Sequence, residues 1–376
     1  MSEIITAQNK DKQDIVDFIN YVFSVAYTAH DFKKKLPKVY ADDAKEDAAT
    51  HYVIKEDGRI KAIVSIRTIF VSICGKILKY GLIGNVAVHP YSRGEGYMRE
   101  LMDRVIEKAK SDGIDLLALT GQRQRYGYFG FSPAGICLRY TITDTNVRHA
   151  LKDIDCSCIS FLPLEKANDE QIDTVLKIYE KRPAHTLRGR DEYINIMSSW
   201  ETQTNLIFNG GQLVGYIYGA LSEVVLENED LLYPVIKAYF NISGTTKAEI
   251  SVQPFEKRRA EMLAAICETR CIAPSSQIKV LNFEGVLSAF LCLKAKVSAL
   301  CDEEKVVKIA DEVLKLSVKS GVAAVKKAGP NELPQLCLTE GEAAELFFGI
   351  EGLMMGNDDI KSFSALPFLI DAPDTF

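Results

Sequence analysis

One segment, from Gly84 to Phe131, constrains the fold of this chain more than any other. It opens with the β-favouring run Val86-Ala87-Val88, and Pro90 ends the strand that this run predicts. The residues Arg93 to Gly96 then lead into a helix whose apolar side chains recur at helical spacing until Gly113, a typical helix end. A second strand and an aromatic turn follow. The segment therefore predicts a strand–turn–helix–strand unit of the kind found in α/β folds.

The turn between this strand and the helix has the chemistry of a phosphate site. Gly94 and Gly96 have no Cβ, so the backbone can approach a ligand closely there. The free N–H groups of the turn and of the first helical turn favour an anion such as a pyrophosphate, and Arg93 adds a cation. The segment lacks a Gly-Lys-Ser/Thr run, which excludes a Walker-type loop. It also lacks a Gly-x-Gly-x-x-Gly run with an acidic partner, which argues against a Rossmann site.

The spacing of these residues resembles the coenzyme A loop of the GNAT acetyltransferase superfamily. Val86-x-Val88-x-Pro90 is followed by Arg93-x-x-Gly96-x-Met98, and one strand later comes an aromatic run from Tyr126 to Phe131. That superfamily often carries Tyr-x-x-Phe-Gly-Phe at this distance. The last loop position is usually Gly or Ala. A bulky apolar residue there, as at Met98, is a feature of the Eis-like (enhanced intracellular survival) branch.

The resemblance implies that the turn binds acetyl-CoA as co-substrate. Backbone N–H groups and one cation would hold the pyrophosphate. Main-chain groups of the preceding strand would face the pantetheine arm and the acetyl carbonyl. The expected coenzyme-binding residues are Val86, Val88, Arg93, Gly94, Gly96, Tyr97 and Met98.

The proton donor for the departing thiolate is expected in the aromatic turn. In the Eis-like pattern Tyr-Gly-x-Phe-Gly the first tyrosine is the proposed acid, and Tyr126 matches it. A phenol with an ordinary pKa near ~10 stays protonated at neutral pH and can donate. Tyr128 takes the variable position and remains the alternative donor.

The base that takes the proton from the amine is not visible near the turn. The strand from Gly81 to Val88 has no Asp or Glu, and Asn85 cannot accept a proton. A lone His89 beside the turn is more often structural. Eis-like proteins use the carboxylate of their own C-terminus, which the resemblance places on Phe376. An α-carboxylate with an ordinary pKa near ~3.5 would act by orienting the amine or through water, with desolvation raising its basicity.

The length of 376 residues predicts two or three domains. Residues 1–145 are expected to form the acetyltransferase domain, in which Asp57-Gly58 and Cys74-Gly75-Lys76 predict the turns of an antiparallel meander. Residues 146–274 are expected to repeat this plan, because Val252-Gln253-Pro254 falls on Val88-His89-Pro90. Lys257 to Ala260 replace the turn glycines there, so this second GNAT-like domain is expected not to bind coenzyme.

Residues 275–376 are expected to form a smaller α+β domain similar to a sterol-carrier protein, which Eis-like proteins carry at the C-terminus. A short strand at Ile278 to Leu281 precedes a helical stripe, and Thr339-Glu340-Gly341-Glu342 predicts a capped helix. The sequence does not say whether this domain binds a lipid. The expected fold class is thus α/β (α+β), with two GNAT-like domains in tandem and a sterol-carrier-like domain.

The composition of the chain limits the kinds of molecule that it is expected to bind. The formal net charge is −6 and the chain has no Lys/Arg-rich block, so nucleic acid is not expected as a partner. No apolar run is long enough to cross a bilayer, and the first residues contain no apolar signal region. A cytoplasmic protein without a membrane partner is therefore expected. The nine cysteines are scattered and lack zinc spacing, which favours reduced thiols and no bound metal.

Together these features predict an acetyl-CoA-dependent N-acetyltransferase. Its acceptor would be a primary amine on an aminoglycoside-like or polyamine-like cation, or a lysine side chain. Asp31, Asp371 and Asp374 are candidates for negative charge at the mouth of the site. Two alternatives stay open: a non-catalytic protein that binds coenzyme A or an apolar ligand, and an acyltransferase that uses a longer acyl-CoA. The resemblance also implies a homo-oligomer, specifically a hexamer. The acceptor cannot be read from the sequence.

Overall fold

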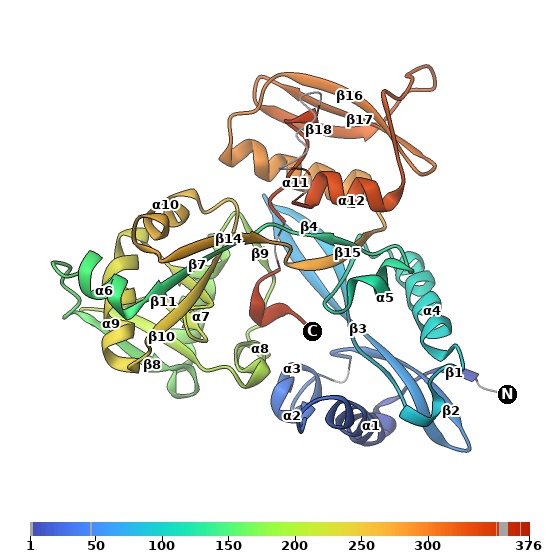
Figure 1. Cartoon of the computed structure of the whole chain (residues 1–376), viewed down its shortest axis with the longest axis horizontal. Helices are drawn as coiled ribbons and strands as arrows, with labels where there is room; N and C mark the ends of the chain where they lie inside the picture. Colours follow the sequence, from blue (N-terminus) through green and yellow to red (C-terminus); the bar gives the residue numbers. More distant parts are fainter. Residues whose placement is uncertain (1–2, 46, 351, 353–359, 369) are drawn as a thin grey trace.

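The first domain is built on an antiparallel meander that continues into a parallel strand pair. The computed structural model describes residues 3–45, 47–350, 352, 360–368 and 370–376, and Figure 1 shows three α/β domains. The meander has the order β1-β2-β3-β4, and β5 pairs in parallel with β4. The strands are β1 (Glu3–Thr6), β2 (Thr50–Glu56), β3 (Arg59–Ile73), β4 (Lys76–Val88) and β5 (Leu116–Leu119). Both expected turns of the meander are confirmed.

Helices cover both faces of this sheet. Alternate residues of a strand point to opposite faces, so Ile54 of β2 packs beneath α4 (Tyr97–Ser111) while its neighbour Val53 packs beneath α1 (Lys12–Ala26). The first domain also contains three short helices: α2 (Phe32–Lys35), α3 (Pro37–Tyr40) and α5 (Arg123–Gly127). The last of these overlaps the start of the expected aromatic turn, at Tyr126 and Gly127.

Strands β4 and β5 separate toward their carboxyl ends. Their pairing covers only Tyr80–Leu82 and Leu116–Ala118, whereas β4 continues to Val88. On its other side β4 bulges against β3, and Asn85 in the bulge has a φ of 49°. We call the opening between β4 beyond Leu82 and β5 beyond Ala118 the splay. It lies directly before the glycine turn.

The second domain contains two sheets. The first has the order β12-β11-β10-β8, and in the second β7 lies between β13 and β14. The strands are β7 (Cys137–Thr143), β8 (Ile159–Pro163), β10 (Thr204–Asn209), β11 (Gln212–Tyr218), β12 (Glu223–Leu226), β13 (Lys247–Val252) and β14 (Thr269–Ala273). The helices are α6 (Asp144–Ala150), α7 (Asp169–Glu180), α8 (Tyr193–Met197), α9 (Leu232–Ser243) and α10 (Lys257–Ile266). A short strand, β9 (Ala184–Thr186), pairs with β3 of the first domain.

The strand order corrects the register expected for the repeat. In the first domain the meander is followed by a helix and then by β5. In the second domain the meander is followed by α9 and then by β13. The counterpart of the glycine turn is therefore the β12–α9 connection, 227–231, and not Lys257 to Ala260. Apolar periodicity alone could not separate these two strand–helix units, because both have it.

The third domain is a four-stranded sheet flanked by helices. The sheet has the order β18-β17-β16-β19, with β19 parallel to β16. Its elements are α11 (Phe283–Val297), β16 (Glu303–Ile309), β17 (Glu312–Lys319), β18 (Val322–Lys327), β19 (Leu336–Leu338) and α12 (Glu340–Phe348). The expected capping box is present, because Thr339 and Glu342 bond to each other's backbone N–H. The likeness to a sterol-carrier protein stays a prediction.

Two strands lie outside the domains to which the sequence limits assigned them. β7, expected within residues 1–145, pairs with β13 and β14 of the second domain. β15 (Ser276–Val280), expected in the third domain, joins the first sheet between β5 and β6 (Ser132–Ala134). The reason is pairing across the chain, which local sequence does not encode.

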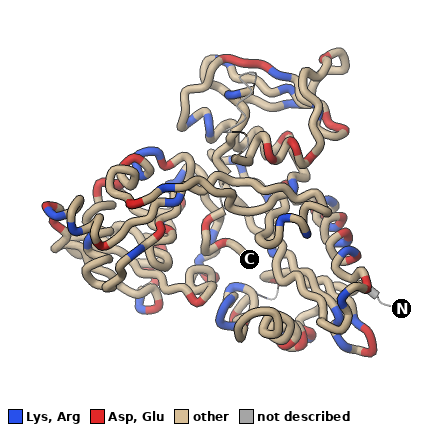
Figure 2. The backbone as a smooth tube through the Cα atoms, viewed as in Figure 1, with Lys and Arg blue, Asp and Glu red and all other residues tan. Residues whose placement is uncertain are grey.

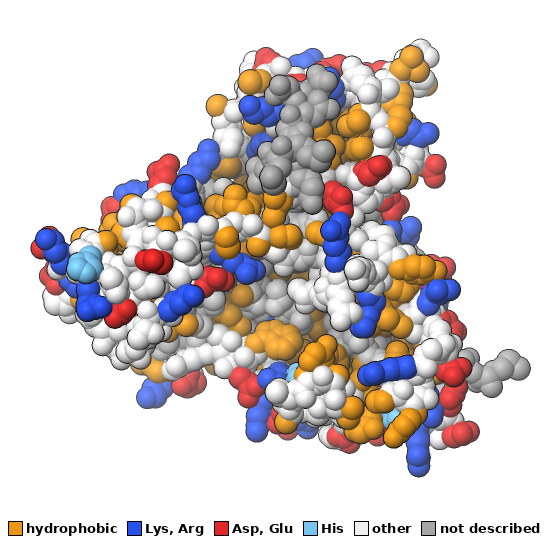
Figure 3. Space-filling model, viewed as in Figure 1, with side chains coloured by type: hydrophobic (Ala, Val, Ile, Leu, Met, Phe, Trp, Pro, Cys, Tyr) orange, Lys and Arg blue, Asp and Glu red, His pale blue; other side chains and the backbone are white. Residues whose placement is uncertain are grey.

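The end of the chain returns to the middle of the molecule. The segment 370–376 leaves the third domain and runs between the first and second domains (Figure 1). Charged residues of both signs are spread over all three domains (Figure 2), whereas apolar side chains gather near the centre of the face shown in Figure 3. We call residues 370–376 the tail.

Candidate active site

A cavity of about 780 Å³ lies between the glycine turn, α1 and the aromatic turn. All seven residues expected to bind coenzyme line it: Val86, Val88, Arg93, Gly94, Gly96, Tyr97 and Met98. The cavity has lining residues that the sequence analysis did not single out, namely Val22, Phe23, Ala26, Tyr27, Ala87, Ser92, Arg99, Arg125 and Phe129. The α1 side chains could not have been chosen beforehand, because their stripe looks like ordinary core.

The turn has the backbone shape that only glycine adopts without strain. Gly94 has a φ of 93° and Gly96 a φ of 84°, and Gly96 is the N-cap of α4. A Cβ built on either residue would meet no atom within 4 Å. The space before both glycines is therefore open, and a phosphate group could reach the N–H groups at the start of α4.

Arginines make the cavity a cationic one. Arg93 is exposed at the turn, and Arg99 lies over the Tyr128 ring at 4.8 Å from its centroid. Arg125 completes the group from α5. The Tyr97 hydroxyl donates to Glu56, so this residue offers the cavity its backbone rather than a free phenol. Three arginines around one opening suit the several phosphate charges of a nucleotide.

Phe376 lies in the splay. It lines a small cavity together with Leu82 and Ile83 of β4 and Ala118 and Leu119 of β5. A Cβ built on Gly84 would lie only 1.9 Å from Cδ1 of the Phe376 ring. The last residue of the chain is therefore seated on β4 at the position where the two strands part.

The two candidate tyrosines have different surroundings. Tyr126 is 6% exposed and packs edge-to-face on Phe131, whereas Tyr128 is 66% exposed and lines the large cavity. Burial raises the pKa of Tyr126, although Arg125 opposes the shift. Tyr126 thus keeps its proton at neutral pH, and it shares a hydrophobic cluster with Leu119 and the partly buried Val86.

Asn85 belongs to a buried polar chain behind the bulge. Its Nδ2 donates to the Tyr40 hydroxyl, and His51 Nδ1 lies 2.6 Å from Ser65 Oγ. Burial, with Lys12 nearby, lowers the pKa of His51 to about 4. A neutral His51 fits a structural role in holding the bulge. His89 stacks on Tyr21 with ring centroids 5.4 Å apart.

The aspartates expected at the mouth are already paired. Asp31 caps α2 and lies 3.5 Å from Lys34 Nζ. Asp371 is buried and accepts from Arg182 Nη1 at 2.8 Å, from the Tyr179 hydroxyl at 3.0 Å and from Gln253 Nε2 at 2.6 Å. The expectation that these residues supply free negative charge is therefore wrong for Asp371, and also for Asp374.

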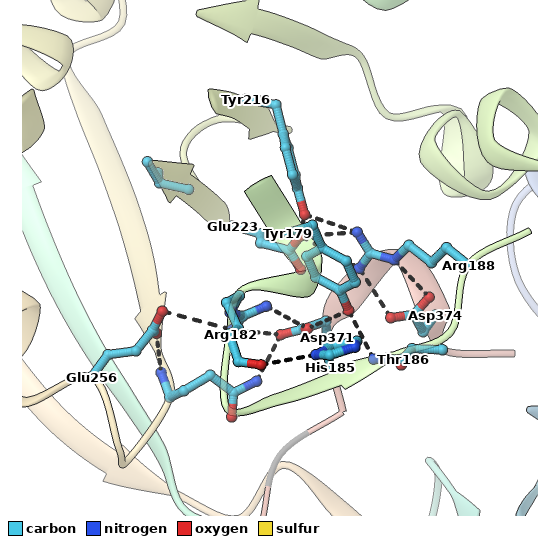
Figure 4. A network of polar contacts seen from close by, with 12 residues as sticks. Tyr179, Arg182, His185, Thr186, Arg188, Tyr216, Glu223, Glu256, Asp371 and Asp374 are labelled. Atoms are coloured by element: carbon cyan, nitrogen blue, oxygen red, sulfur yellow. Dashed lines mark hydrogen bonds and ion pairs between the residues drawn. The ribbon is translucent and has the colours of Figure 1, made fainter. Parts of the chain in front are cut away.

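Asp374 is completely buried and bound by Arg188 through both of its oxygens. Nε of Arg188 lies 3.1 Å from Oδ1, and Nη2 lies 3.0 Å from Oδ2. Figure 4 shows this pair beside Glu223 and Tyr216, with Asp371 and Arg182 next to it. Burial alone would raise the pKa of Asp371, but Arg182 and Arg188 outweigh it and hold that pKa below its usual value.

Comparison with known proteins identifies the first domain. Residues 3–134 match the family model of the acetyltransferase (GNAT) domain. The chain carries a GNAT acetyltransferase domain. No curated protein matches the sequence.

Solved structures match the chain over its whole length. A conserved protein of unknown function from Enterococcus faecalis, described as a probable N-acyltransferase, has 13% identity and a TM-score of 0.72. A GCN5-related N-acetyltransferase from Anabaena variabilis has 14% identity and a TM-score of 0.69, and Eis1 from Mycobacterium abscessus has 14% and 0.68. Each alignment covers 100% of both chains. The resemblance to the Eis-like GNAT fold is thereby confirmed.

Neither a metal site nor a membrane-spanning helix is found in the described part of the chain. Among the described residues, no three His, Cys, Asp or Glu side chains gather in a way that could hold a metal ion. No helix in the described part of the chain has the length and apolar character needed to cross a membrane.

Proposed function

We propose that this GNAT protein transfers an acetyl group from acetyl-CoA to a primary amine. The observation that carries the proposal is that one strand connects the glycine turn to the seat of Phe376. The glycine turn, which has open space before it, follows the same strand, β4, on which Phe376 is seated. A pyrophosphate at the turn would direct a pantetheine arm along β4 toward the splay.

The chain's own groups would then handle the protons. The amine nitrogen forms a bond to the acetyl carbonyl carbon, and the carbon–sulfur bond breaks. The carboxylate of Phe376 receives the ammonium proton, directly or through water, and Tyr126 gives its proton to the thiolate. The phenolate regains a proton from solvent. Main-chain N–H groups of the bulged strand are suited to stabilise the developing oxyanion.

The acceptor class remains a proposal drawn from the resemblance: a cationic amine on a small molecule or a lysine side chain. The buried tail aspartates do not contribute to it, because their charges are neutralised by arginines. A homo-oligomer, specifically a hexamer, also remains a prediction, and light scattering at micromolar concentration can check it.

The test is release of free thiol from acetyl-CoA in the presence of a panel of amines. We expect turnover with at least one amine and no turnover without one. A C-terminal tag should abolish it, because it moves the carboxylate away from the splay, and the same tag at the N-terminus should not. Coenzyme binding without turnover would favour a sensor, and turnover only with long acyl chains would favour another donor.

A further inference from the structure

The last residues of the tail are held by buried cations from two different domains. Arg188 of the second domain binds both oxygens of Asp374, and neither side chain is exposed by more than 1%. Lys38, in α3 of the first domain, is 2% exposed and donates to the carbonyl oxygen of Pro373 at 2.7 Å and also to that of Thr375. Arg67 of β3 lies 3.5 Å from the Asp374 carbonyl. The three residues directly before the chain end thus each have a cationic partner.

These contacts are costly to build, which suggests that they do more than add stability. A buried ion pair loses hydration that its attraction often only balances, so an apolar replacement would serve stability as well. Arg188 also reaches Glu223 and Tyr216, which fix the guanidinium from behind. Lys38 has two carbonyl acceptors, and an amine can donate to both in its charged or neutral form. This arrangement therefore fixes the position of residues 373–375.

We propose that Lys38 and Arg188 are positioning residues: they hold residues 373–375 so that Phe376 stays seated on Gly84 in the splay. In the part of the chain that the structure describes, no cation is paired with Phe376, whose ring packs against Gly84 and against two hydrophobic clusters. This packing places the ring, and the held residues before it direct the end of the chain into the splay. The second domain then has a role although it is expected to bind no coenzyme, since it supplies Arg188. The catalytic consequence rests on the proposed function, but the holding of the tail does not.

The first measurement does not depend on activity. A carboxypeptidase that removes C-terminal aromatic residues releases Phe376 only when the tail opens, so its rate reports the open population. We expect release to be at least about tenfold faster in Asp374→Asn and in Lys38→Met than in the unchanged chain. Glu227→Gln is the matched control, because it breaks an exposed pair with Lys181 that does not touch the tail. Thermal unfolding of each variant verifies that it is folded.

The second measurement is turnover in a double-mutant cycle. Asp374→Asn and Lys38→Met should each lower kcat about 10- to 100-fold at unchanged acetyl-CoA affinity. In a chain that lacks Phe376, Asp374→Asn should cause no further loss, because it acts through that residue. If Asp374→Asn lowers kcat by the same factor in the chain without Phe376 as in the full chain, the positioning role is overturned.

The outcomes separate this inference from the proposed function. Release as slow in both folded variants as in the control would overturn the inference and leave the proposed chemistry untouched. Fast release with unchanged turnover would support the holding of the tail and sink the terminal carboxylate as base.

Discussion

The two GNAT-like domains share an order of strands and helices but differ at the connection that follows the fourth strand of the meander. In the first domain this connection is the turn with Gly94 and Gly96, whose faces are open. In the second it is Glu227-Asn228-Glu229-Asp230-Leu231, which has no glycine and carries three carboxylates. Glu229 binds Arg259 of α10 there, with Nη2 and Oε1 among the paired atoms. One scaffold therefore supports a candidate anion site in one copy and an acidic, internally paired loop in the other.

The difference shows what each copy contributes. The first offers the cavity and the splay, and the second offers buried arginines that bind the tail. A repeated fold can thus keep its architecture while its loops take separate tasks, because the core and the loops are encoded by different residues.

The strongest test of this contrast is Gly96→Glu. The glutamate would enter the open space before the turn, repel a pyrophosphate and strain a backbone with a φ of 84°. We expect complete loss of acetyl-CoA binding by calorimetry, and one coenzyme per chain in the unchanged protein. A stoichiometry of two would show that the acidic loop also binds, and the contrast between the domains would fail.

Tyr126→Phe should give the next largest effect. Removing a proton donor typically costs about 10²–10⁴ in rate, while the packing of the ring is kept. We therefore expect near-normal acetyl-CoA affinity and a large fall in kcat. Tyr128→Phe is the matched control on the exposed side of the same turn. If that variant is the inactive one, the donor is Tyr128.

Gly84→Ala tests the seat of Phe376 with one methyl group. The backbone of Gly84 does not need glycine, but its new Cβ would collide with the Phe376 ring. A displacement of about 1 Å can cost about 10²-fold in rate, so kcat should fall by that order with coenzyme binding retained. Adding Phe376→Ala should restore space and part of the activity. No gain in the double variant would speak against steric displacement as the cause.

The smallest expected effect concerns the second domain and pH. Burial and the neighbouring Asp371 raise the pKa of Glu223 to about 7, against the opposing effect of Arg188. An unfolded Glu has a pKa near ~4.3, so between these values the native state keeps a proton that the unfolded state has lost. Stability should therefore fall as the pH rises through this window and level off above it.

Glu223→Gln removes that titration. Its Tm should change little between about pH 5 and pH 8, whereas that of the unchanged chain should fall by about 2–5 °C. Parallel Tm curves for the two proteins would show that Glu223 is already ionised in the native state.

The sequence predicts the coenzyme side of the site better than the tail. Val86 to Met98 form one continuous segment, so local spacing is enough to bring seven residues to one cavity. Arg188 and Asp374 lie 186 positions apart, and Lys38 and Pro373 lie 335 apart. Single charged residues at such distances leave no local pattern. The same limit explains why local sequence does not predict the sheets that β7 and β15 join.

The placement of β15 has a consequence for how this protein is made. The sequence unit matched by the family model ends at residue 134, yet its sheet is completed by a strand that begins at Ser276. On the ribosome, at roughly 5–20 residues per second, β5 and β6 would wait on the order of ten seconds for the strand that lies between them. The acetyltransferase domain is therefore a unit of sequence but not a unit of folding. A nascent chain that stops before β15 should expose an unpaired edge, with the attendant risk of aggregation.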